Sequence, residues 1–134
     1  MIMLALGMLG GCAPQEARVR PTAHMVRFEF IHQGHRETFY AETDDPRLIA
    51  KVREELKKPL SQRTLHIHGL IARDANGVND PWHWHYVNGN WGLTEMSMEL
   101  CDGWPSYVET HLDDWLKKVG SFCPWDSRVV RELE

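Results

Sequence analysis

Apolar and polar residues alternate along several short segments of the chain, as they do in strands that bury one face. The first two segments are VRFEFI at residues 26–31 and ETFYAET at residues 37–43. A short connection that contains Gly34 joins them, so we expect a β-hairpin. TLHIHGLIAR at residues 64–73 predicts a third strand, and SRVVREL at residues 127–133 predicts a final one.

Two further strands are predicted in the middle of the chain. WHWHYV at residues 82–87 and LTEMSMELC at residues 93–101 both alternate, and NGNWG at residues 88–92 lies between them. Asparagine followed by glycine between alternating segments is typical of a hairpin turn. We therefore expect these two strands to pair, with His85 opposite Glu95.

Helical spacing of apolar residues predicts two helices. The first is expected to begin at Pro46, after a cap from Asp44 or Asp45, with an apolar stripe below it. This stripe consists of Leu48, Ile49, Val52 and Leu56. The second helix is expected to begin with Ser106 as its cap and to end at Gly120. Together the elements predict an α+β fold, a mostly antiparallel sheet of about five to six strands with both helices packed on one face.

Side chains of a strand point alternately to opposite faces, so the three central strands each have an apolar and a polar face. The apolar face would carry Trp82, Trp84 and Tyr86 together with Met96, Met98 and Leu100. The polar face would gather His66, His68, His83, His85, Glu95 and Glu99. Imidazoles and carboxylates suit Zn²⁺, Cu²⁺ or Ni²⁺, so these six residues form a predicted metal site. A solvated histidine face and a small-ligand pocket are the alternatives.

Three tryptophans lie outside the alternating strand positions, beside turn residues. They are Trp91, Trp104 and Trp125. An exposed group of aromatic side chains would suit a protein- or glycan-interaction module. The alternative is that these tryptophans cover the ends of the core.

The N-terminal residues predict export. MIMLALGMLGG at residues 1–11 is too short to cross a bilayer and is typical of a signal peptide. It is followed by Cys12, as in bacterial lipoproteins, in which that cysteine carries the lipid; a secretory signal with an incidental cysteine is the alternative. Residues 12–25 would then be the lipidated cysteine and a tether, and residues 26–134 would be the domain. The lipid would attach the protein to a membrane of the bacterial cell envelope.

Two further cysteines, Cys101 and Cys123, remain beside Cys12. A pair of cysteines in an oxidising compartment favours a disulfide, which would close a loop of about twenty residues. A pair of thiolate metal ligands is the alternative, although the spacing is not that of a CxxC motif.

Composition and motifs exclude some classes of function. The net charge is −4 and no basic run is long enough for nucleic-acid binding. The sequence contains no GxSxG, P-loop or HExxH motif, so we do not expect an enzyme. Binding of a ligand or of an envelope partner is the function that remains.

Several stretches together resemble a known family of domains. They are PWxxH (Pro81, Trp82, His85), ELCDGxPSYVE (residues 99–109) and CPWxSRxVRE (residues 123–132). These resemble the N-terminal domain first named in a eukaryotic calmodulin-binding protein, which also occurs in short secreted or lipid-anchored bacterial proteins. The resemblance implies no catalytic activity. It places His66 and His85 on family positions, and it agrees with a bridge between Cys101 and Cys123.

Overall fold

The N-terminal hairpin forms two of the three strands of the first sheet. In the computed structural model, which describes residues 24–74 and 76–134, β1 (Val26–His32) pairs antiparallel with β2 (Glu37–Thr43). The last strand, β6 (Ser127–Leu133), pairs with the other edge of β1, which gives the order β2-β1-β6. The predicted hairpin and the predicted final strand are both confirmed.

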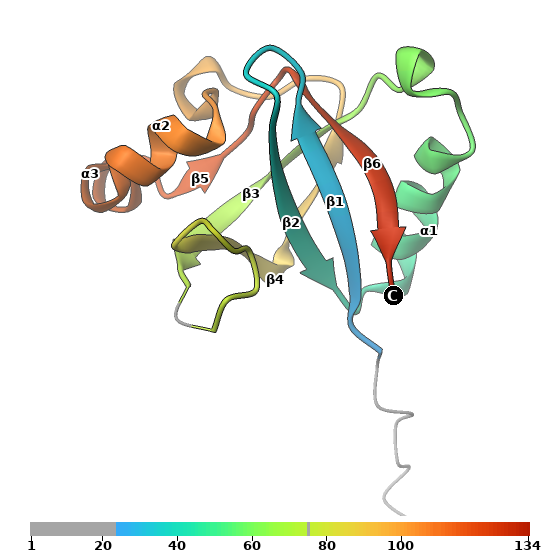
Figure 1. Cartoon of the computed structure of the whole chain (residues 1–134), viewed down its shortest axis with the longest axis horizontal. Coiled ribbons are helices and arrows are strands. Elements are labelled where there is room, and N and C mark those ends of the chain that lie inside the picture. The colour runs from blue at the N-terminus through green and yellow to red at the C-terminus, as the bar shows by residue number, and fades with distance from the viewer. Residues whose placement is uncertain (1–23, 75) are drawn as a thin grey trace, which may run out of the picture.

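The remaining strands form a second sheet. Its order is β4 (Trp84–Thr94), β3 (His66–Arg73) and the short β5 (Ser121–Phe122). Figure 1 shows the sheet β2-β1-β6 in front of β3 and β4. The α+β class is therefore confirmed, whereas the prediction of one sheet of five to six strands is wrong. Two sheets that face each other can bury a core between them.

The strand β4 replaces the predicted hairpin of residues 82–101. Gly69 of β3 is paired with Trp91, and Ile71 with Tyr86, so the residues between Tyr86 and Trp91 form a bulge in one continuous strand. Gly89 in this bulge has a φ of 83°, which glycine adopts without strain. The Asn-Gly sequence thus makes a bulge and not a turn.

The chain leaves the second sheet at Thr94. The Thr94 hydroxyl donates to the carbonyl of Met96 (2.9 Å) and accepts from the Met96 backbone N–H (3.3 Å). The chain then enters the 3₁₀ helix η2 (Glu99–Cys101). The predicted strand over residues 93–101 is therefore wrong beyond Thr94.

The first predicted helix is confirmed as α1 (Pro46–Leu56). The carboxylate of Asp45 accepts a hydrogen bond from the backbone N–H of Arg47 (2.9 Å), which caps the helix. The helix contacts β6 and β4, and Leu48 and Val52 are buried beneath it. A short 3₁₀ helix, η1 (Leu60–Gln62), leads from it toward β3.

The second predicted helix is two short helices. They are α2 (Pro105–Thr110) and α3 (Leu112–Lys118), separated at His111, whose φ of −120° is not helical. These helices lie on the opposite side of the molecule from α1, and α2 contacts β2 (Figure 1). The prediction that the helices share one face of a sheet is wrong. Among residues 24–74 and 76–134, no helix is long and apolar enough to span a membrane.

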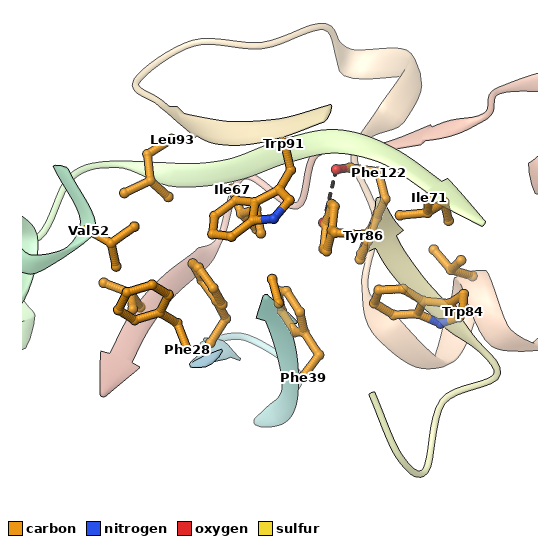
Figure 2. Close-up of a cluster of buried hydrophobic side chains, with 14 of the residues drawn as sticks. Phe28, Phe39, Val52, Ile67, Ile71, Trp84, Tyr86, Trp91, Leu93 and Phe122 are labelled. Atoms are coloured by element: carbon orange, nitrogen blue, oxygen red, sulfur yellow. Dashed lines mark hydrogen bonds between the residues drawn. The ribbon is translucent and has the colours of Figure 1, made fainter. Parts of the chain in front are cut away.

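Aromatic residues from both sheets form the core. Figure 2 shows Phe28 and Phe39 facing Tyr86 and Trp91 across the space between the sheets. The hydroxyl of Tyr86 satisfies its hydrogen bond inside the core by donating to the Phe122 carbonyl (3.0 Å). The predicted apolar positions Trp84 and Tyr86 of β4 are thus confirmed as core, and Trp82 is partly buried against it.

Candidate functional site

Residues 95–101, which follow β4, present apolar side chains to solvent. Met96 is 85% exposed, Met98 71% and Leu100 68%. These three were predicted to be core. That prediction is wrong because, among the residues that the structure describes, no strand pairs with the segment that follows Thr94. We call the exposed side chains of Met96, Met98 and Leu100 the methionine surface.

The backbone that carries the methionine surface is fixed at two points. The Nε2 atom of His66, in β3, lies 2.7 Å from the hydroxyl of Ser97, between the two methionines. At the other end, the predicted disulfide joins Cys101 to Cys123, and the Cys123 backbone N–H donates to the Cys101 carbonyl (2.7 Å). Because both attachments lie on the inner side of the segment, Met96, Met98 and Leu100 point outward.

A groove of about 450 Å³ lies beside the methionine surface. Besides the methionine surface itself, His68 of β3, Val119 and the disulfide line it. A smaller groove of about 220 Å³ continues from Met96 to His66, Arg128 and Trp125. The two grooves share Met96 and Ser97, so the methionine surface is one side of a continuous depression.

The two histidines of this depression are poor bases. Burial lowers the pKa of His66, and the charge of Arg128 lowers it further. Burial also lowers the pKa of His68, with a second contribution from Lys51. Both imidazoles are therefore neutral at pH 7 and have a nitrogen lone pair available as an acceptor or ligand.

The other two predicted metal-site histidines lie at the opposite end of β3. The Nδ1 of His83 and its backbone N–H both bond to the carboxylate of Glu109 in α2, and this partner raises the pKa of His83. His83 and Glu109 border a polar groove of about 500 Å³ that also contains the ion pair Arg73–Asp113. These ion pairs link α2 and α3 to the end of the second sheet.

The side chain of His85, in β4, lies next to the loop that follows β3. Its Nδ1 is buried and lies 3.7 Å from a carboxylate oxygen of Asp74. Burial alone would raise the pKa of Asp74, but hydrogen bonds from the backbone N–H groups of Asn76 and Asn79 lower it overall. His85 thus lies over a hydrogen-bonded loop and not over the methionine surface.

The six predicted metal ligands are divided between these two ends. His66 is opposite Thr94, whereas His85 is opposite Ala72, six residues farther along β3, which corresponds to about 20 Å. The predicted pair of His85 with Glu95 is therefore not formed, and Glu95 and Glu99 are both exposed. Across residues 24–74 and 76–134, no three His, Cys, Asp or Glu side chains are grouped as metal ligands.

The three loop tryptophans have three different environments. Trp91 lies in β4, is only 7% exposed and donates from its indole N–H to the Glu42 carbonyl (2.7 Å). Trp104 is half-buried and stacks on His35, with ring centroids 4.2 Å apart. Trp125 is 41% exposed at the edge of the smaller groove. Of the predicted tryptophan patch, Trp125 is the member that borders the methionine surface.

Alternation alone did not identify the methionine surface, because apolar residues at alternate positions are also what a buried strand requires. A second signal was present in the sequence. Glu95 and Glu99 flank the methionines, and the segment ends at a cysteine expected to be bridged. An acidic segment that contains methionines and ends at a disulfide suits an exposed connection as well as it suits a strand.

A family model matches the whole of the chain that the structure describes. The family model of the BP-74 N-terminal domain, the family that the sequence motifs resemble, matches residues 24–134. The chain belongs to this family. In this member of the family, the Asp102 carboxylate accepts a hydrogen bond from the Trp125 backbone N–H (2.9 Å), beside the Cys101–Cys123 disulfide. Searches of curated proteins and of solved structures each found no match.

Proposed function

We propose that the chain is a non-catalytic binding domain of the bacterial cell envelope, attached to a membrane by a lipid on Cys12. Its binding surface would be the methionine surface with the adjoining groove. The observation that carries the proposal is the exposure of Met96, Met98 and Leu100. Large contiguous apolar patches on a folded domain mark interaction sites.

The energetics favour a partner with an apolar face. Full burial of a methionine or leucine side chain contributes roughly 1.5–3 kcal/mol. Leu70, 44% exposed, and Val119 lie near the same groove and would extend the buried area. Methionine side chains are flexible and polarizable, so they can adapt to partners of different shape.

The charges around the methionine surface favour a basic partner. Glu95 and Glu99 are both exposed on either side of the two methionines. Arg128, the nearest basic residue of the smaller groove, directs its guanidinium to the backbone carbonyls of Arg63, Trp125 and Ser127. An amphipathic segment with lysine or arginine beside its apolar face would therefore be complementary.

The chemistry of the methionine surface supports binding without catalysis. Thioether and alkyl side chains neither donate nor accept protons in a reaction. A protein-interaction module accounts for these side chains better than an exposed three-tryptophan surface, because Trp91 is in the core.

Fluorescence anisotropy with two labelled peptides tests the proposal. One is an amphipathic leucine–lysine helix, and the other has the same composition in a scrambled order that removes the apolar face. The amphipathic peptide should bind to the unsubstituted domain. The double substitution Met96→Glu/Leu100→Glu should lower the affinity for this peptide by more than roughly tenfold, because each lost apolar side chain contributes more than about 1.4 kcal/mol, which corresponds to a factor of about ten.

Met25→Glu is the matched control, because Met25 is 48% exposed at the start of the described chain, outside both grooves. It should bind the amphipathic peptide as the unsubstituted domain does. Equal binding of both peptides would show that charge alone attracts the peptide, and an equal loss in the Met25 variant would show that the loss is not specific to the methionine surface. Either result would contradict the proposal.

A further inference from the structure

The donor atoms gathered beside β3 differ from those predicted from the sequence. The expected carboxylates point to solvent, whereas Met96 and Met98 line the same groove as His68. A thioether and an imidazole are both neutral ligands, and thioether sulfur is soft. Sulfur of this kind selects Cu(I) over the harder divalent ions.

We infer that Met96, Met98 and His68 form a binding site for Cu(I) at the edge of the groove. This site is independent of the proposed peptide-binding function, although it uses part of the same surface. The two methionines lie on the outer side of one segment, two residues apart, and both line the groove that His68 also lines. Their three side-chain torsions let the sulfur atoms converge on one ion.

His68 is placed as a ligand requires. It is opposite Gly92 in β4. If residue 92 were alanine, its Cβ atom would lie 3.4 Å from the Nε2 atom of His68. The absence of a side chain at Gly92 therefore leaves the imidazole edge open.

Neighbouring residues favour Cu(I) over Zn²⁺. Cys101 and Cys123 line the groove, but they are bonded to each other and provide no thiolate. His66 is engaged by Ser97, so it positions the methionine-bearing segment. Zn²⁺ sites are usually built from several thiolate, imidazole or carboxylate ligands, and this groove presents one free imidazole.

Competition with a chromophoric Cu(I) chelator under ascorbate tests the inference. The folded domain, prepared without a His-tag, should bind one equivalent of Cu(I). Met96→Leu/Met98→Leu and, separately, His68→Phe should each weaken binding by roughly 100-fold or more, since even residues that only orient a ligand are worth about 10–100-fold. His83→Ala, at the far end of β3, should leave the affinity unchanged.

The leucine substitutions separate this inference from the proposed function. Leucine keeps the apolar surface but lacks sulfur, so Met96→Leu/Met98→Leu should still bind the amphipathic peptide. Unchanged Cu(I) affinity in that variant, or weakened affinity in His83→Ala, would overturn the copper site. If the unsubstituted domain binds Cu(I) as expected but does not bind the amphipathic peptide, that result would instead overturn the proposed function alone.

Discussion

The imidazole of His66 and the hydroxyl of Ser97 are in hydrogen-bond contact, with 2.7 Å between Nε2 and Oγ. This contact joins β3 to the segment that carries Met96 and Met98. His66 is buried, with 3% of its surface exposed, so its ring nitrogen depends on the Ser97 hydroxyl for a hydrogen-bond partner. Through this contact His66 orients the methionine surface, although His66 is not part of that surface.

Ser97→Ala should therefore destabilise the domain. Removal of the hydroxyl leaves a buried imidazole nitrogen without its partner, which costs about 1–3 kcal/mol. Urea unfolding should show the loss, and hydrogen exchange should quicken at the amides of Met96 and Met98. The control is Ser61→Ala in the exposed 3₁₀ helix η1, which should change little. Equal stability of the two variants would argue against the anchoring role of Ser97.

The disulfide should be a major contributor to stability. Cys101 and Cys123 are separated by 22 residues, and closing a loop of that length stabilises the folded state by about 3 kcal/mol in the chain-entropy model. Cys101→Ser/Cys123→Ser should lower the free energy of unfolding by that order, measured without reductant. A loss below roughly 1 kcal/mol would mean that the bridge does little to restrict the unfolded chain.

Stability should fall in mild acid. The folded-state pKa values of His66 and His68 both lie below the ordinary 6.5, mainly because both side chains are buried. The charge of Arg128 lowers the pKa of His66 further, and the charge of Lys51 lowers that of His68. The unfolded chain therefore takes up protons before the folded one does. The contribution of these residues is complete above pH 6.5 and is lost as the pH falls through the folded-state values.

Histidine NMR titration checks this directly. His66 and His68 should titrate below 6.5, and His83 should titrate above it in the same spectrum, because Glu109 accepts its hydrogen bond. The free energy of unfolding should also be lower at about pH 5.5 than at about pH 7.5. A His66 midpoint at or above 6.5 is the result that disagrees with its burial.

Membrane attachment should depend on Cys12, which lies outside the residues that the structure describes. Expressed with its own leader in a bacterium, the chain should incorporate an alkyne-labelled fatty acid and fractionate with membranes. Cys12→Ala should abolish the label and release the protein. Labelling that persists in this variant, or membrane association without a label, would contradict the lipid anchor.

Much of the fold could be predicted from the sequence wherever local signals agree with tertiary pairing. Asp45 and Pro46 define the start of α1, and the alternation of residues 26–31 and 37–43 specifies the first hairpin. The disulfide was predicted from the number of cysteines and an oxidising compartment. For the helix and the hairpin the local pattern has one physical interpretation.

The second sheet was mispredicted because one local signal has two interpretations. The sequence Asn88-Gly89 suits a tight hairpin turn, but the long-range pairing of both halves of β4 with β3 makes it a bulge. That difference moves His85 away from Glu95 and ends the strand at Thr94. Alternation also cannot show which sheet face is covered, so the exposure of the methionines could not be deduced from it.

Methionine methyl NMR gives the most direct test of the methionine surface. With the methyl carbons labelled, the amphipathic peptide should shift the signals of Met96 and Met98, and leave that of Met25, an equally observable exposed methionine, in place. That result would place the partner on the methionine surface. Peptide binding with unmoved Met96 and Met98 signals, or with Met25 shifted as strongly, would contradict the account.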